Sequence, residues 1–205
     1  MPDVSGRKLT RREVQKAEQY LTHRDCVLGD LIVQHGPCDL HASRKPPFSS
    51  LARTIIGQQL SVKAANTIAR RILDTLNSKT ITPESWQAAS DDDLRAAGLS
   101  RPKIRYINEL ASNVISGTID FEQLEDLDES SSIQILTSMP GVGKWTAEMY
   151  LIFCQKRPDI LALDDAALRR AVKILYPGNE LETFKASWAP YCSVASWYLW
   201  KYLDS

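Results

Sequence analysis

The stretch Leu136–Ala147, LTSMPGVGKWTA, decides how the rest of this sequence is interpreted. In it, an apolar helical pattern is interrupted by Pro140–Gly143 and then resumes toward Cys154. We predict two helices joined by a tight turn, in which the two glycines allow positive φ and Val142 anchors the turn in the core. Backbone N–H groups at the start of the second helix would then offer a site for a phosphate oxygen, with Lys144 beside it.

Elsewhere in the chain, apolar residues recur at three- and four-residue spacing, and the alternation typical of half-buried strands is hard to find. The sequence therefore predicts an all-α fold of roughly eight to ten helices. Several expected helices follow a residue whose side chain can cap free backbone N–H groups, namely Ser61, Thr82, Ser90 and Ser100. Gly98 and Gly117 suit helix ends.

Composition argues against a strongly charged, a metal-binding, a secreted or a membrane-inserted protein. The 25 Lys and Arg residues balance 25 Asp and Glu residues, so any attraction for nucleic acid must be local. The 4 cysteines are scattered without the spacing of a metal site, which favours a reducing compartment. Residues Met1–Gln15 lack the apolar core of an export signal, and no apolar run of roughly eighteen residues occurs. We expect neither secretion nor membrane insertion.

Two adjacent carboxylates, Asp164 and Asp165, precede a segment with a helical apolar face. A helix cap with a favourable dipole interaction explains such a pair on its own. Asp165 also follows Trp145, just after the Pro140–Gly143 turn, by 20 positions.

This combination of turn and aspartate resembles the helix-hairpin-helix (HhH-GPD) DNA glycosylase superfamily, in particular the 3-methyladenine DNA glycosylase II family. The motif GQQLS at Gly57–Ser61 and the tail WAPYCSVASWYLW at Trp188–Trp200 extend the resemblance over Pro46–Leu203. It implies two helical lobes, residues 1–45 with 160–205 and residues 46–159, with an active-site cleft between them. The implied partner is duplex DNA containing a damaged base, bound by a monomer in a bacterial cytoplasm or a eukaryotic nucleus.

The resemblance also assigns roles to individual residues. Asp165 would be the catalytic carboxylate, which leaves Asp164 to serve the helix cap. Gln59, with Leu60 next to it, would be the wedge that fills the space of an extruded base; the alternative is a pair of buried amides that tie the turn together. The implied base pocket consists of Trp145, Trp200 and Met149, whereas Trp188, Trp197 and Tyr198 are expected in the core. The implied DNA contacts are Gly141, Gly143, Lys144, Thr146, Arg101 and Lys103.

The expected chemistry is hydrolytic excision of alkylated bases such as 3-methyladenine and 7-methylguanine. Bifunctional relatives carry a lysine where this chain has Trp145, so the resemblance implies no lyase activity. No cofactor is required and the cysteine pattern of an iron–sulfur cluster is lacking. A Na⁺ or K⁺ ion would be held by the backbone carbonyls of Thr137, Met139 and Val142.

Two alternatives stay open. One is a glycosylase for neutral bases such as hypoxanthine, ethenoadenine or mismatched uracil. The other is a non-catalytic protein that binds damaged DNA. Met149, Ala166 and Cys192 depart from residues common in the family, so the excised base is not fixed by the resemblance.

Overall fold

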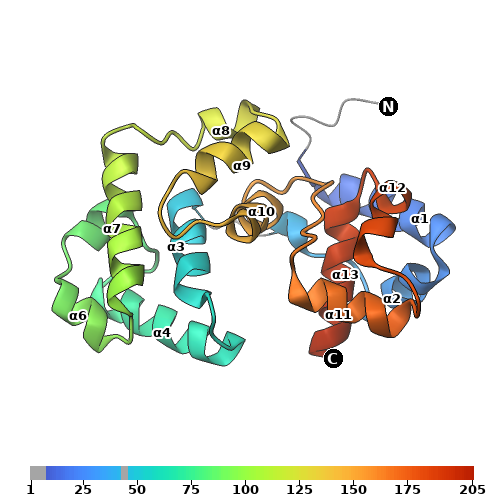
Figure 1. Ribbon diagram of the computed structural model, residues 1–205, viewed down its shortest axis with the longest axis horizontal. Helices are drawn as coiled ribbons and strands as arrows, with labels where there is room; N and C mark the ends of the chain where they lie inside the picture. The colour runs from blue at the N-terminus through green and yellow to red at the C-terminus, as the bar shows by residue number, and fades with distance from the viewer. Residues whose placement is uncertain (1–7, 43–45) are drawn as a thin grey trace. The chain divides into compact units, whose positions relative to one another are not determined.

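The structure is a computed structural model that describes residues 8–42 and 46–205. These residues form helices and loops with no strand among them, which confirms the predicted all-α class (Figure 1). The described part contains 13 α-helices, more than expected. Four of them span only 4 to 6 residues and are too short to show helical periodicity, but two of these four begin after the expected caps Thr82 and Ser90. The first seven residues, on which the expectation about export partly depends, lie outside the described residues.

The chain divides into two compact units, one of Met1–Arg44 with Leu151–Ser205 and the other of Lys45–Tyr150. We expected the second boundary after residue 159, whereas the division falls inside α10 (Lys144–Phe153). The first boundary was expected at residue 45, which lies outside the described residues.

The unit Lys45–Tyr150 is organised around α7 (Arg101–Ile115). Its other helices are α3 (Pro47–Gly57), α4 (Val62–Thr75), α5 (Pro83–Gln87), α6 (Asp91–Ala96), α8 (Gln123–Asp126), α9 (Glu129–Thr137) and the first part of α10. Helix α7 contacts α3, α5 and α6, while α4 contacts α3 and α6. Ile104, Ile107 and Leu110 of α7 are buried at helical spacing, as expected of a helix that packs on several neighbours.

The other unit combines the two ends of the chain. It contains α1 (Arg11–Arg24), α2 (Cys26–His35), η1 (Leu40–Ala42), α11 (Ala166–Leu175), η2 (Leu181–Phe184), α12 (Lys185–Trp188) and α13 (Cys192–Asp204). Helix α13 contacts α1, α2 and α11. The Asp25 carboxylate accepts hydrogen bonds from the Trp188 indole at 2.8 Å and from the Tyr176 hydroxyl. These bonds join segments that lie far apart in the sequence.

The helix starts follow the capping predictions at three of four positions. Ser61 and Ser90 accept backbone N–H groups of α4 and α6, and Thr82 forms a reciprocal capping box with Ser85 at α5. Ser100 precedes α7 but makes no capping hydrogen bond, so that prediction is wrong. Pro102 removes one of the N–H groups that a capping side chain can accept, while the Lys103 N–H three residues on from Ser100 is not bonded by it either.

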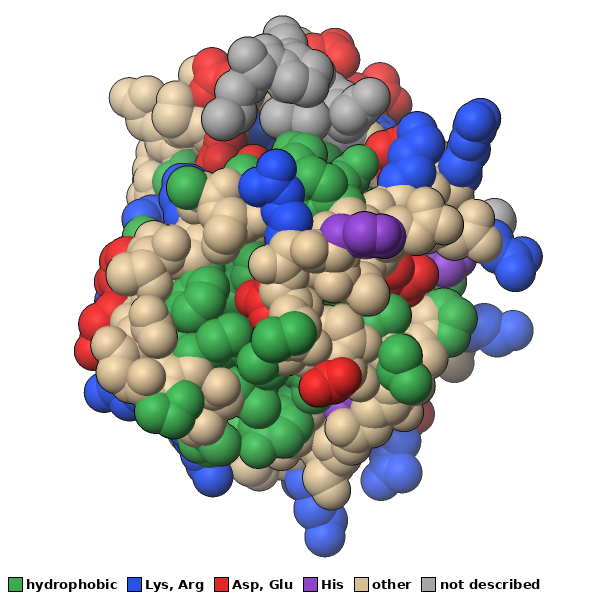
Figure 2. Space-filling model, turned by 90° about the vertical axis from the view of Figure 1, so that its right-hand side faces the viewer, with side chains coloured by type: hydrophobic (Ala, Val, Ile, Leu, Met, Phe, Trp, Pro, Cys, Tyr) green, Lys and Arg blue, Asp and Glu red, His purple; other side chains and the backbone are tan. Residues whose placement is uncertain are grey.

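Charge is spread rather than concentrated on the face of the molecule shown in Figure 2. Hydrophobic side chains gather in its lower left part, and Lys and Arg side chains project around its edge. Within residues 8–42 and 46–205, none of the helices has the length and apolar character needed to cross a membrane.

Candidate functional site

The turn between α9 and α10 depends on one glycine more than on the other. Gly141 has a φ of 79°, and a Cβ placed there would lie 2.9 Å from the Tyr106 Cβ and closer still to the ring. A side chain at this position would therefore meet both backbone strain and a clash. Gly143 does not use the positive φ that glycine allows, and a Cβ added there would meet open space.

The remainder of the turn matches the expected hairpin. Val142 is only 4% exposed and anchors the turn, with its N–H donating to the Met139 carbonyl at 3.1 Å. The N–H of Ala147 donates to the Gly143 carbonyl, which begins the hydrogen bonding of α10. The first N–H groups of a helix have no carbonyl partner within it, so the turn presents donors suited to an anion.

A hollow of about 660 Å³ adjoins this turn. Its lining consists of Gln58, Gln59, Ser100, Pro102, Lys103, Tyr106, Thr137, Met139, Pro140, Gly141, Val142 and Gly143. Among the hydrogen bonds of the described residues, none ends on the carbonyl oxygen of Thr137 or Val142, while the Met139 oxygen accepts one. These carbonyls suit a monovalent cation, which prefers oxygen ligands.

The turn between α3 and α4 places two amides in different environments. The Gln58 amide nitrogen donates to the Gly141 carbonyl at 2.8 Å and to the Thr146 hydroxyl at 3.1 Å. Gln59 is exposed and has a φ of 58°, and the adjacent Leu60 is 38% exposed. Gln58 thus ties the turn together, which was the alternative role expected for these amides. Both expected wedge residues, Gln59 and Leu60, lie at the surface.

Two expected DNA contacts of this unit are engaged within the protein. The Lys103 ammonium donates to the carbonyls of Ile56 at 2.7 Å and Gln58 at 2.8 Å, and its partial burial lowers its pKa. Thr146 is 2% exposed, and its hydroxyl is the acceptor for Gln58. The side chains of both residues therefore organise the turns, while the exposed Lys144 lies 3.8 Å from the Glu148 carboxylate.

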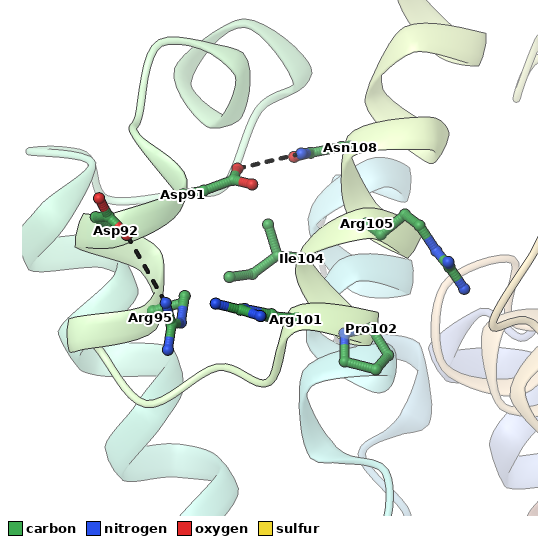
Figure 3. Close-up of a pocket in the computed structure, with 8 residues that line it drawn as sticks. All are labelled: Asp91, Asp92, Arg95, Arg101, Pro102, Ile104, Arg105 and Asn108. Carbon is green, nitrogen blue, oxygen red and sulfur yellow. Dashed lines mark hydrogen bonds and ion pairs between the residues drawn. The ribbon is translucent and has the colours of Figure 1, made fainter.

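Arg101 lines a second hollow, of about 570 Å³, between α6 and α7 (Figure 3). Arg95 on the opposite side lies 3.9 Å from the Asp92 carboxylate. Figure 3 shows Arg101 extending toward Arg95, while Arg105 points away and lies over the Tyr106 ring. Within the described residues, Arg101 has no carboxylate partner, which leaves its charge available for a phosphate.

In the other unit, Asp165 is 6% exposed at the amino end of α11. Its Oδ1 accepts the Leu168 N–H at 2.8 Å and the Trp200 indole N–H at 3.2 Å. Asp165 is thus the helix cap, and the prediction that Asp164 serves the cap is wrong. Asp164 lies one residue before the capping position, from which its side chain does not reach the free N–H groups of α11. It is exposed.

Aromatic and hydroxyl groups support the segment that carries Asp165. Trp200 packs against Phe153 with ring centroids 5.5 Å apart, which fixes the indole that donates to Asp165. The buried Ser193 hydroxyl donates to the Arg157 carbonyl at 2.7 Å and accepts the Ile160 N–H at 3.0 Å. The loop before Asp165 is therefore attached to the start of α13.

The expected pocket residues divide between the two units. Trp145 and Met149 belong to Lys45–Tyr150, where Trp145 is 36% exposed and Met149 is 7% exposed. Trp200 belongs to the same unit as Asp165. The structure thus brings together Asp165 with Trp200, and separately the hairpin with the Gln58–Leu60 turn.

Comparison with known proteins shows in which family the hairpin, the Gln58–Leu60 turn and the buried Asp165 occur together. The family model described as "HhH-GPD superfamily base excision DNA repair protein" matches residues 52–189, which include the Gln58–Leu60 turn, the hairpin and Asp165. The chain belongs to this superfamily.

Similar proteins and solved structures share most of their length with this HhH-GPD protein. DNA-3-methyladenine glycosylase 1 of Schizosaccharomyces pombe is 36% identical over 166 residues, 77% of this chain and 73% of the relative. A DNA-3-methyladenine glycosidase structure from Bacillus halodurans is 38% identical, with a TM-score of 0.76, covering 90% of this chain and 88% of the other. The S. pombe 3-methyladenine DNA glycosylase Mag1 in complex with abasic DNA is 32% identical, with a TM-score of 0.80, covering 93% and 97%.

Three residues of the site in this HhH-GPD chain were not expected from the sequence, namely Tyr106, Phe153 and Ser193. They act through contacts with residues distant in the sequence. A tying role was an alternative for the amides of the α3–α4 turn, but the partners of Gln58 could not be predicted. Ser193 lies within the tail motif, which indicated its position but not its partners. Tyr106 and Phe153 resemble ordinary core aromatics.

Proposed function

We propose that this chain is a monofunctional DNA glycosylase that hydrolyses the bond between an alkylated base and its deoxyribose in duplex DNA. The observation that carries the proposal is the buried Asp165 carboxylate, held by the cap of α11 and the Trp200 indole, in a chain that belongs to a base excision repair superfamily. The names of the similar proteins, 3-methyladenine glycosylases, support alkylated purines as the substrate class.

In the proposed reaction, the bond from C1′ to the base nitrogen lengthens, and positive charge develops on the sugar. A fixed carboxylate in a site shielded from bulk water stabilises this oxocarbenium-like species. The base leaves with the electrons of the broken bond, and a water molecule adds to C1′ and gives its proton to the Asp165 carboxylate. An alkylated cationic base leaves as a neutral molecule, so this step needs no separate acid.

DNA would be held by the hairpin and by nearby basic residues. The first N–H groups of α10 suit a phosphate oxygen, and Lys144 and Arg101 add exposed positive charge. The carbonyls of Thr137, Met139 and Val142 would hold a Na⁺ or K⁺ ion, which would add positive charge to the same turn. All of these DNA contacts come from a single chain, so we propose that the protein acts as a monomer. We propose that it acts in the compartment that holds the cell's DNA.

The substrate is tested with a panel of labelled duplexes, each carrying one lesion, followed by alkali to reveal abasic sites. We expect release of 7-methylguanine and 3-methyladenine and little release of undamaged bases. Release confined to hypoxanthine, ethenoadenine or uracil would favour the alternative of a glycosylase for neutral bases. Tight duplex binding without release from any lesion would favour a non-catalytic damage-binding protein.

Borohydride trapping tests the absence of lyase activity. The position of the lysine nucleophile in bifunctional relatives is occupied by Trp145, which has no amine to form a Schiff base. We expect no covalent protein–DNA adduct under conditions in which the lesion is fully excised. An adduct that disappears in Lys144→Ala would contradict the proposal and identify the neighbouring lysine as a nucleophile.

A further inference from the structure

The α3–α4 turn, residues Gly57–Ser61, is attached to two other parts of its unit. The Gln58 amide bridges the Gly141 carbonyl, within the hairpin turn, and the Thr146 hydroxyl, in the first turn of α10. A single amide thus connects the turn that carries Gln59 to the element that would bind phosphate. The two segments are 83 residues apart in the sequence, so no local preference creates this register.

Lys103 secures the same turn from α7. Its ammonium donates to the carbonyls of Ile56 and Gln58, at the carboxyl end of α3. The last turn of α3 contains no basic residue of its own, and the final carbonyls of a helix lack partners within it. A cation from α7 satisfies two carbonyls there and complements the negative end of the helix dipole.

These attachments surround a residue in an unfavourable backbone conformation. Gln59 has a φ of 58°, in the left-handed region that glutamine rarely adopts. Such conformations persist when the surrounding structure determines them and occur often at functional sites. Gln58 is fixed through both its side chain and its carbonyl, so the exposed Gln59 and Leu60 are presented in one conformation.

We infer that Gln58 and Lys103 are positioning residues that hold Gln59 and Leu60 in register with the phosphate-binding hairpin, ready to fill the space of an extruded base. The inference rests on the proposed function. Extrusion costs a few kcal/mol of stacking, and an inserted side chain offsets part of it only when the DNA backbone and the wedge are held at a set distance. The contribution of Gln58 and Lys103 is therefore specific to substrates that must be unstacked.

The test compares Gln58→Ala and Lys103→Met with wild type on one lesion, placed in duplex and in single-stranded DNA. We expect kcat/KM on duplex to fall by about 10- to 100-fold, the scale that a displacement of about 1 Å produces, with the single-strand value nearly unchanged. A 2-aminopurine next to the lesion reports extrusion directly, and its fluorescence rise should slow in both variants. Gln59→Ala provides the comparison for loss of the wedge itself.

Conservative variants distinguish positioning from a general structural role. Lys103→Arg retains donors for both carbonyls and should recover most duplex activity, whereas Gln58→Glu has no N–H group for Gly141 and should not. Gln134→Ala, at an exposed glutamine of α9, is the matched control and should behave as wild type. Thermal unfolding of each variant shows whether the fold is retained.

Equal losses on duplex and single strand, or unchanged extrusion kinetics in both variants, would overturn the inference. If Gln58→Ala lowers thermal stability, the contrast between Lys103→Arg and Lys103→Met still decides. If wild type releases no base from any lesion, the proposed function fails, but the 2-aminopurine signal still tests whether these two residues control extrusion.

Discussion

Asp165→Asn is expected to reduce base release by at least about 10²–10³-fold, the cost of removing one preorganised electrostatic group from an active site. The amide keeps an oxygen for the Leu168 N–H and the Trp200 indole, and asparagine is as good a helix cap as aspartate. Thermal stability and binding to abasic duplex should therefore change little. Single-turnover release of 7-methylguanine measures the effect.

Asp164→Asn is the matched control for this variant. It makes the same chemical change one residue away, on an exposed side chain that does not cap α11. Its base release should stay within about threefold of wild type, since exposed charges interact weakly. Near-normal release by Asp165→Asn, or equal losses in the two variants, would contradict the assignment of Asp165 as the catalytic carboxylate.

Gly141→Ala should lower the free energy of unfolding by about 2–5 kcal/mol. Left-handed φ costs a residue with a Cβ roughly 1–2 kcal/mol, and overpacking adds about 1–3 kcal/mol. The added methyl group would clash with Tyr106, and relief of that clash requires the hairpin or α7 to move. DNA binding should fall with stability, as measured by chemical denaturation and by titration of abasic duplex.

Gly143→Ala separates folding from DNA contact. This glycine has neither a positive φ nor a neighbouring atom within 4 Å of an added Cβ, so stability should change by less than about 1 kcal/mol. Duplex binding should still weaken, because a methyl group at the start of α10 obstructs the approach of a phosphate. The two variants are compared directly. If Gly141→Ala were as stable as wild type, the contact between residue 141 and Tyr106 would not constrain the turn, which would contradict the first of these predictions.

Much of the fold follows from local chemistry and could be predicted from the sequence. Thr82 and Ser90 cap their helices because their side-chain oxygens lie within reach of N–H groups three residues on. Val142 is buried in its turn as expected. Ser100 shows where this reasoning fails, since a capping residue type does not ensure a capping hydrogen bond.

The site was less predictable because its side chains find partners across long sequence separations. The choice between Asp164 and Asp165 for the cap depends on the helix start to within one residue, which sequence patterns do not resolve. Lys103 belongs to a basic cluster that suggested phosphate contact, but its partners are carbonyls 45 and 47 residues away. The Lys103 ammonium reaches these carbonyls only because α7 packs against α3.

The hydroxyl of Ser193 has a consequence for the order in which the chain becomes competent. It attaches the carbonyl of Arg157 and the N–H of Ile160 to the start of α13, the same helix that supplies Trp200 to Asp165. During synthesis, Asp165 leaves the ribosome before either of these supports exists. A polypeptide truncated before Ser193 therefore retains the hairpin and Asp165 but lacks both of these supports.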